Sequence, residues 1–160
     1  MLKIIRRQQK GFTLIELLIV ITIISALAIA VFVALNPAQR LKDAKDARRT
    51  ADADTILTAI HASIVDTKGS LPTGLTTGMA ETQLGTGATG CTLTAVGGCT
   101  TGDVCVDLST PLAKYLKSIP YDPSAGDSEH TYYSVVLNEN NIVTVRACGA
   151  EGGEEISVSR

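Results

Sequence analysis

The chain has 160 residues and a mass of 16.8 kDa, enough for one small domain with an appendage but not for two enzyme-sized domains. Apolar residues make up 45% of it and charged residues 19%, a balance that excludes a wholly disordered chain. The net charge of −2 provides no basic field for nucleic acid, and the absence of Trp with only 4% aromatic residues disfavours a base-stacking surface.

The first predicted element is an apolar segment at residues 12–35, where 20 of 24 residues are apolar. No charged residue occurs from Leu17 to Gln39, and a helix of this length spans the hydrocarbon core of a bilayer. Basic residues precede it with no acidic residue among them: Lys3, Arg6, Arg7 and Lys10. This bias predicts a single-pass segment whose N-terminus stays in the cytoplasm.

Three interpretations of this segment compete. A cleaved secretory signal peptide is the first, because Ala28-Ile29-Ala30 has the small residues of a cleavage site. The apolar run continues beyond that site, however, and exceeds a usual signal core. A plain membrane anchor is the second, but it leaves Glu16 without a partner for a carboxylate that is costly in a membrane.

The third interpretation rests on a short motif, Lys10-Gly11-Phe12-Thr13-Leu14-Ile15-Glu16-Leu17. It closely resembles the class III signal sequence of type IV pilins and related pseudopilins. The resemblance implies that residues 1–11 are a leader removed by prepilin peptidase, which cuts after Gly11 and then N-methylates Phe12. It also implies that Glu16 of one subunit pairs with the Phe12 amino group of a neighbour during assembly. A contact of Glu16 with its own N-terminus or with lipid headgroups is the alternative.

Residues 36–66 are predicted to form an amphipathic helix. Pro37 is a helix breaker, which either begins a new helix with Asn36 as its cap or kinks one long helix. Apolar residues then recur at three- and four-residue spacing through residues 38–66. The alternating basic and acidic residues between them predict a solvated face with weak ion pairs, or else charge matching between subunits along a filament.

Residues 67–110 are predicted to be a Thr/Gly-rich surface loop. Between Thr73 and Gly102 there are 10 Thr and 8 Gly, and Glu81 is the only charged residue. Glycine disfavours regular helix and threonine favours extended or turn structure. The matching segment of pilins faces outward in the filament.

Residues 111–160 are predicted to form the head. A short helix is expected at residues 111–119, followed by a turn-rich stretch in which His130 lies in an ordinary solvated turn. Residues 131–137 and 142–148 are rich in β-branched side chains and predict a hairpin, with a possible final strand at residues 156–158.

The fold class that these elements predict is α+β. A long N-terminal α-helix, membrane-spanning in its first half and amphipathic in its second, precedes a small antiparallel β-sheet head. This is the layout of pilins.

Four cysteines, an even number, lie on the predicted outer side of the membrane, which favours disulfides. No C-x-x-C pair occurs, which disfavours zinc. Four cysteines allow three connectivities, and we expect Cys91–Cys99 to close the Thr/Gly-rich loop and Cys105–Cys148 to tie it to the hairpin.

A Gly-rich acidic loop near the C-terminus contains Glu151, Glu154 and Glu155. Pseudopilins often hold Ca²⁺ in an acidic loop near this position, and carboxylate oxygens suit such a hard cation. The alternative is an acidic surface turn without metal. We expect no cofactor, with structural calcium at these three residues as a weak candidate.

The sequence shows no phosphate-binding loop, no nucleotide-binding glycine motif after a strand, and no cluster with metal-ligand spacing, so we expect no enzyme activity. The resemblance predicts a structural pilin that polymerises through its N-terminal helix into a type IV pilus for adhesion, twitching motility or DNA uptake. One alternative is a pseudopilin of a type II secretion or competence system. Another is a single-pass membrane-anchored binding module that never polymerises.

The partners implied by the resemblance are other copies of the chain, prepilin peptidase, and the pilus assembly platform with its ATPases. Direct contact with nucleic acid is not predicted, because the basic residues at 40–49 are matched by acidic ones. The expected location is the bacterial cytoplasmic membrane before assembly and the cell surface afterwards.

Overall fold

The computed structural model describes residues 11–153 and 155–160. The chain divides after Arg40 into two compact units, which we describe separately. The predicted leader therefore lies outside the described residues except for Gly11.

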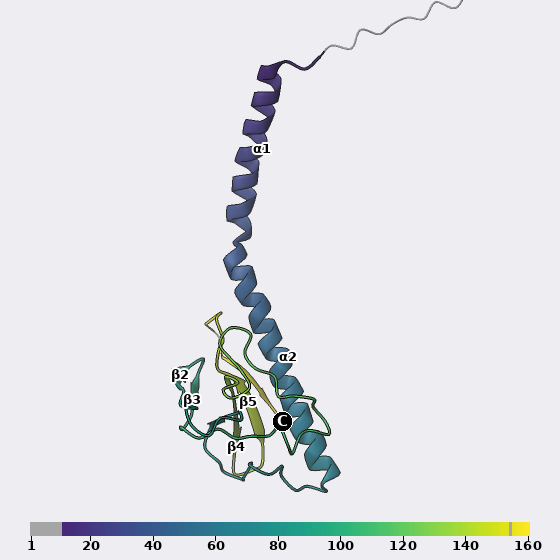
Figure 1. The fold of residues 1–160 in the computed structure, drawn as a ribbon, viewed down its shortest axis with the longest axis vertical. Coiled ribbons are helices and arrows are strands. Elements are labelled where there is room, and N and C mark those ends of the chain that lie inside the picture. Colours follow the sequence, from purple (N-terminus) through teal and green to yellow (C-terminus); the bar gives the residue numbers. More distant parts are fainter. Residues whose placement is uncertain (1–10, 154) are drawn as a thin grey trace, which may run out of the picture. The chain divides into compact units, whose positions relative to one another are not determined.

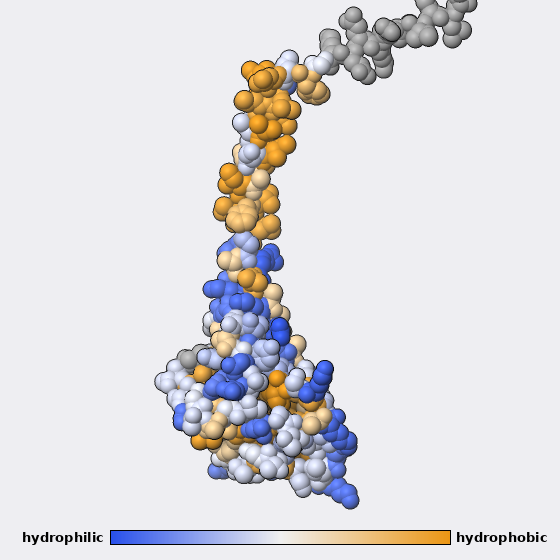
Figure 2. Space-filling model, viewed as in Figure 1, coloured by the Kyte–Doolittle hydropathy of each residue, from blue (hydrophilic) through white to orange (hydrophobic). Residues whose placement is uncertain are grey.

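The first unit contains helix α1, Leu14–Leu35, and the start of helix α2, Pro37–Asp66. All of α1 is exposed, and Figure 2 shows hydrophobic residues covering it. Its polar side chains are largely satisfied locally: the hydroxyls of Thr22 and Ser25 donate to the carbonyls of Ile19 (2.8 Å) and Ile21 (2.7 Å). Helix α1 is thus long and apolar enough to cross a membrane, with its backbone groups paired internally.

A single residue, Asn36, separates the two helices. Its backbone is left-handed (φ 40°, ψ 70°) and ends α1, and α2 begins at Pro37. The carbonyl of Asn36 accepts hydrogen bonds from the amides of Gln39 (3.1 Å) and Arg40 (3.2 Å). Proline suits a first helical position because no hydrogen-bond donor is needed there. Both predictions for Pro37 are therefore met in part, because α2 begins at Pro37 while α1 and α2 together form one long helical segment from Leu14 to Asp66.

The second unit contains a four-stranded antiparallel sheet in the order β1-β4-β5-β6, of which Figure 1 labels β4 and β5. Its strands are β1 (Thr82–Gln83), β4 (Tyr133–Leu137), β5 (Val143–Ala147) and β6 (Ile156–Ser159). A separate hairpin joins β2 (Thr94–Val96) to β3 (Cys99–Thr100). The predicted α+β class with an antiparallel head is confirmed, and the central hairpin and final strand lie where the β-branched residues indicated.

The core of the head lies between the sheet and α2. Alternate residues of β4 face inward, and each is paired with a buried residue of β5: Tyr133 with Ala147, Val135 with Val145, and Leu137 with Val143. Helix α2 contributes buried residues at helical spacing, Ala53, Ile56, Leu57 and Ile60. The inward-facing residues of the strands, at every second position, therefore pack against those of α2, at every third or fourth position, in one hydrophobic layer.

The Thr/Gly-rich segment does not behave as the predicted surface loop. It sends Leu75, Leu84 and Leu108 into the main core, and it contains β1, β2 and β3. Glycine permits this path at Gly85 (φ 159°), because a Cβ there would overlap the carbonyl of Glu129. The prediction counted glycines as a sign of exposure, whereas they allow close approach of backbone segments.

The short helix predicted at residues 111–119 is also wrong. This segment forms consecutive turns, with amide–carbonyl bonds from Leu112 to Leu108 and from Leu116 to Leu112. Pro120 disfavours helical geometry at the preceding residue, and so short a segment gains too few hydrogen bonds to offset helix nucleation. Leu112 is nevertheless buried, as the spacing of apolar residues within 111–119 predicts.

Candidate functional site

The residues of the predicted cleavage site lie just before α1 in backbone without regular secondary structure. Residues 11–13 are exposed, and the side chain of Phe12 is 87% accessible. A Cβ placed on Gly11 would meet no atom within 4 Å among the described residues. The Gly11–Phe12 bond is therefore open to a protease, as exposed segments beside an ordered element usually are.

Glu16 takes part in a capping box at the start of α1. Its Oε2 accepts from the Thr13 amide (2.8 Å) and the Thr13 hydroxyl (2.9 Å), while the Glu16 amide donates to the Thr13 Oγ1 (3.3 Å). This reciprocal arrangement satisfies free amides at the helix start. No described residue donates to its Oε1. This box was not among the features predicted from the sequence, although Thr-x-x-Glu before an apolar run is its usual signature.

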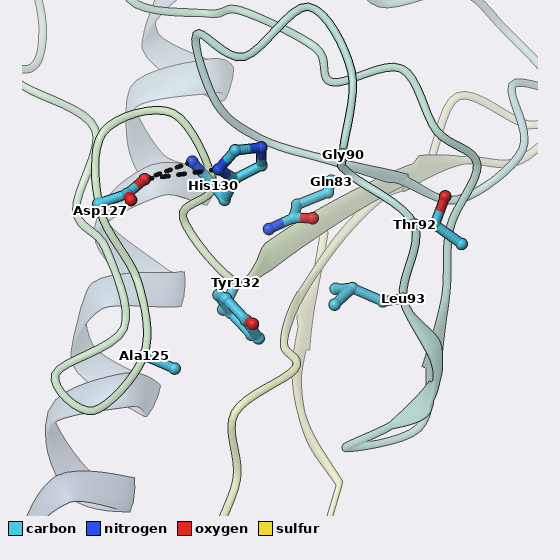
Figure 3. A pocket seen from close by; sticks show the side chains of 8 residues that line it. All are labelled: Gln83, Gly90, Thr92, Leu93, Ala125, Asp127, His130 and Tyr132. Atoms are coloured by element: carbon cyan, nitrogen blue, oxygen red, sulfur yellow. Dashed lines mark hydrogen bonds and ion pairs between the residues drawn. The ribbon is translucent and has the colours of Figure 1, made fainter.

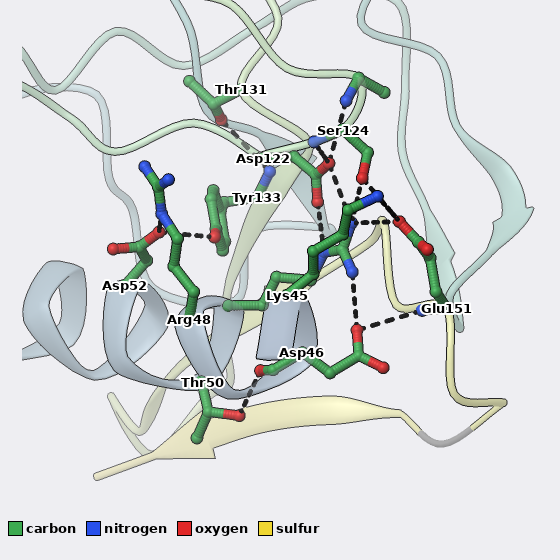
Figure 4. Close-up of polar contacts among 12 residues, drawn as sticks. Lys45, Asp46, Arg48, Thr50, Asp52, Asp122, Ser124, Thr131, Tyr133 and Glu151 are labelled. Atoms are coloured by element: carbon green, nitrogen blue, oxygen red, sulfur yellow. Dashed lines mark hydrogen bonds and ion pairs between the residues drawn. The ribbon is translucent and has the colours of Figure 1, made fainter. Parts of the chain in front are cut away.

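A buried arginine joins α2 to the rest of the head. Arg49 is fully buried, and its guanidinium binds Asp122 through two bonds, Nε to Oδ2 at 2.5 Å and Nη2 to Oδ1 at 3.1 Å. Its Nη1 donates to Asp46 Oδ1 at 2.7 Å. Figure 4 shows the surrounding acidic side chains Asp46, Asp122 and Glu151. Burial opposes the guanidinium charge, but the bonds to Asp122, Asp46 and Glu151 outweigh that effect and raise the pKa of Arg49. Arg49 is thus held as a cation inside the head.

The C-terminal loop reaches the same place through Glu151. Its Oε1 accepts from Ser124 Oγ (2.6 Å), Lys45 Nζ (3.1 Å) and Arg49 Nη2 (3.2 Å). These three donors, with Ser124 contributing most, lower the pKa of Glu151 to about 2. In return, the Glu151 amide donates to Asp46 Oδ1 (3.1 Å).

We call these residues the Arg49 cluster: Lys45, Asp46, Arg49, Asp122, Ser124 and Glu151. The cluster ties together α2, the turn before β4 and the loop before β6. The expectation of a solvated charged face holds for Arg48, which is 60% exposed beside Asp52, but is wrong for Arg49. Sequence spacing alone does not distinguish these two neighbours, because the partner that buries Arg49 lies 73 residues away.

The calcium prediction falls on this loop. Glu154 lies outside the described residues, and Glu155 is exposed beside Gly98. The Oε1 of Glu151 faces two cationic groups, which oppose a divalent cation at that oxygen. Calcium binding stays a prediction, and the geometry of Glu151 stands against it.

The expected disulfide pairing is wrong. Cys91 pairs with Cys105 (Cα–Cα 5.3 Å) and Cys99 with Cys148 (Cα–Cα 5.5 Å). The reason is the hairpin of β2 and β3, whose turn contains Gly97 (φ 55°) and Gly98 (φ 80°). A hairpin centred there brings Cys91 beside Asp103, whose carbonyl accepts from the Cys91 amide (3.0 Å), and so within reach of Cys105, and it leaves Cys99 at the turn end, away from Cys91. Two glycines flanked by Thr-Ala-Val and Cys-Thr are a hairpin signature, so this turn could have been predicted from the sequence.

Comparison with known proteins gives one match. The family model described as the prokaryotic N-terminal methylation motif matches residues 6–32. No curated protein and no solved structure matches the chain. The matched segment includes Gly11, Phe12 and Glu16 and most of α1. The chain therefore carries the class III signal of type IV pilins and pseudopilins.

Proposed function

We propose that the chain is a structural pilin subunit that polymerises through its N-terminal helix into a type IV pilus. The observation that carries this proposal is the placement of the methylation motif: an exposed Gly11–Phe12 bond stands directly before an apolar helix whose only charged residue is Glu16. A secretory signal discards its apolar segment, whereas cleavage at Gly11 keeps all of α1 in the mature protein.

The precursor is a single-pass protein of the cytoplasmic membrane. Helix α1 has 22 residues and so a length of about 33 Å, close to the thickness of a bilayer core. Prepilin peptidase cuts after Gly11 and methylates the new amino group of Phe12. The assembly platform and its ATPases then move the subunit into a surface fibre used for adhesion, motility or DNA uptake.

Glu16 sets the position of each subunit in the fibre. In a lipid or protein interior its carboxylate needs a positively charged partner, and cleavage creates one as the Phe12 amine. Thr13 occupies only Oε2, so Oε1 can accept from the amine of a neighbouring subunit while the capping box persists. Such a pair forms only when two helices have the correct axial offset.

Substitution of Glu16 separates the charge from the cap. Glu16→Gln keeps a capping-box acceptor at this position but carries no charge, whereas Glu16→Ala removes both. We expect both variants to insert in the membrane and to yield roughly tenfold fewer fibres or less, because losing the carboxylate leaves the Phe12 amine buried and unpaired, which costs well over about 1.4 kcal/mol. Membrane fractionation and fibre shearing measure the two quantities, and Thr22→Val is the matched control within α1.

Normal fibre assembly by Glu16→Gln would show that the cap, not the charge, is what assembly requires. Normal localisation and fibre formation by Glu16→Ala would instead support the rival function, an anchored binding module that never polymerises.

A pseudopilin is the alternative within the same family. The displayed-pilus proposal is supported by two disulfides that fix the Thr/Gly-rich segment and by the pairing of Glu151 with Lys45 and Arg49. Adding Ca²⁺ to the full chain in detergent is expected to leave its melting temperature unchanged. A calcium-dependent rise that Glu155→Gln abolishes would favour the pseudopilin.

A further inference from the structure

A polar cavity of about 300 Å³ opens on the head, apart from the N-terminal motif and the Arg49 cluster (Figure 3). One wall comes from residues 90–93 of the disulfide-linked loop, and the other from residues 125–132. The size is at the lower end of small-molecule sites. It therefore suits one small ring and not an extended chain.

The cavity is held in shape without a ligand. Gln83, oriented to satisfy both neighbours, donates to the carbonyl of Cys91 (3.0 Å) and accepts from the amide of Tyr132 (3.0 Å), so it joins the two walls. The Cys91–Cys105 disulfide fixes one wall covalently. In the other wall, Asp127 Oδ1 accepts from the amides of Glu129 (2.9 Å) and His130 (2.7 Å). Such preorganisation lowers the entropic cost of binding.

The ring of His130 is also fixed in place. Its Nε2 lies 3.0 Å from the carbonyl of Thr89, and a Cβ on Gly90 would come within 3.0 Å of the same nitrogen. Tyr132 lines the cavity with a left-handed backbone (φ 60°), a costly conformation for a bulky residue. Strain of this kind persists where the surrounding structure demands it, and it gathers at binding sites.

The lining offers hydrogen-bond donors and acceptors, and its one permanent charge is the carboxylate of Asp127, with the His130 Nδ1 3.8 Å from its Oδ1. Thr92 and Tyr132 provide hydroxyls, and no described residue donates to the Oδ2 of Asp127. Asp103 stands behind the loop wall, with its Oδ1 3.4 Å from the Thr92 hydroxyl. Among the lining residues there is no Lys or Arg. The cavity therefore suits a ligand with several hydroxyls and disfavours an anion.

We propose that this cavity binds a single sugar ring, preferring amino sugars to neutral sugars and neutral sugars to uronic acids. Hydroxyls at several positions of the ring match the mixed donors and acceptors of Thr92, Asp127 and Tyr132, and the aromatic side chain adds apolar contact. The order of preference follows from the carboxylate of Asp127. The site belongs to the head alone and does not depend on filament assembly.

The test titrates the full chain with D-glucosamine, D-glucose and D-glucuronate. The chain is kept in a zwitterionic detergent, because alkyl glycosides would themselves compete. Saturation-transfer NMR at neutral pH measures each Kd, and we expect values on the order of millimolar for the best sugar, as for a small preformed site. Glucosamine should bind best and glucuronate worst. No binding of any of the three, or tightest binding of glucuronate, overturns the proposal.

Two variants then locate the site. Asp127→Asn keeps the Oδ1 acceptor for the turn and should weaken glucosamine about twofold to fivefold while improving glucuronate, the range of an exposed charge interaction. Tyr132→Phe should weaken all three sugars. The controls are Asp107→Asn, whose Oδ1 accepts from the Ser109 amide outside the cavity, and the exposed Tyr121→Phe.

Folding of each variant is checked by its circular dichroism and melting temperature. Unchanged sugar affinities in both Asp127→Asn and Tyr132→Phe would place binding elsewhere and overturn the proposal. Glu16→Ala should bind sugars as the wild type does, so failure of the sugar site and failure of the filament proposal are distinguishable.

Discussion

Arg49 lies in a different environment from its sequence neighbour Arg48. It is fully buried and bound to Asp122, which is 2% exposed, whereas Arg48 next to it points outward. Burying an ion pair of this kind costs the desolvation of both charges. The fold therefore loses most stability when one partner is removed and the other charge stays buried and unpaired. The cluster therefore serves to hold the turn before β4 and the loop before β6 in place on α2.

Replacing Arg49 tests this. Arg49→Met leaves Asp122 buried and unpaired, and we expect a loss of about 3–5 kcal/mol in the free energy of unfolding. Arg48→Met removes only an exposed pair and should cost at most about 1 kcal/mol. Denaturant unfolding of the full chain in detergent measures both. Equal costs for the two variants would contradict a special role for Arg49, and Arg49→Met/Asp122→Leu should recover part of the loss.

The pH dependence of stability follows from Glu151. Its pKa is lowered from 4.5 to about 2, and the pKa of Asp46 is also lowered, by the amide of Glu151 and by Arg49 against an opposing effect of burial. A carboxylate with a lowered folded-state pKa stabilises the fold fully above its unfolded pKa, and this stabilisation is lost as pH falls through the folded value. Stability should therefore fall between pH 4.5 and about 2.

Melting temperatures recorded from pH 5 to pH 2 check this expectation. Glu151→Gln keeps the Oε1 acceptor but cannot titrate, so its melting temperature should fall less steeply than that of the wild type. Glu139→Gln, in the exposed turn between β4 and β5, is the matched control and should follow the wild type. An unchanged slope in Glu151→Gln would refute the assignment.

At the scale of elements, the β2–β3 hairpin depends on two cross-links. Cys99–Cys148 joins its turn end to the end of β5, and Cys91–Cys105 closes its open end. Their sequence separations of 49 and 14 residues correspond to about 4 and 3 kcal/mol in the chain-entropy model. The hairpin has little apolar content of its own, so we infer that both bonds are needed to keep it on the sheet.

Peptide mapping without reduction tests the pairing. Trypsin leaves three of the cysteines in one peptide, because no Lys or Arg occurs between Lys68 and Lys114. A second cut before Asp103 separates Cys105 from Cys91 and Cys99. The structure predicts that three peptides then remain linked through two disulfides, and fragmentation should locate the Cys99–Cys148 bond. A released peptide with an internal Cys91–Cys99 bond would contradict the structure and support the pairing expected from the sequence, Cys91–Cys99 with Cys105–Cys148.

The sequence was sufficient for elements whose cause is local. The apolar run defined α1, Pro37 began α2, and the β-branched and aromatic residues of β4 and β5 defined the central hairpin. Features that depend on distant partners were missed: Asp122 buries Arg49, and the backbone of Glu129 approaches Gly85. Hydrophobic periodicity reports burial along one element, but it says nothing about which loop closes over it.

At the scale of the whole molecule, each unit has a separate role in the proposed function. Helix α1 is exposed and apolar along its length, so it is suited to lipid first and to neighbouring helices afterwards. The head is stabilised by its own core, two disulfides and the Arg49 cluster. We therefore expect substitutions in α1 to affect filament assembly. Substitutions in the head should affect its stability or its ligand binding, with little effect on assembly.

The measurement that tests the central claim most directly is the mass of the mature N-terminus, obtained by mass spectrometry of protein recovered from the surface of cells. Cleavage after Gly11 and methylation predict a chain that begins at Phe12 and carries one added methyl group on its amine. A control from cells without prepilin peptidase should retain residues 1–11. A mature chain that begins at Met1, or at Val31 after cleavage by signal peptidase, would contradict the account.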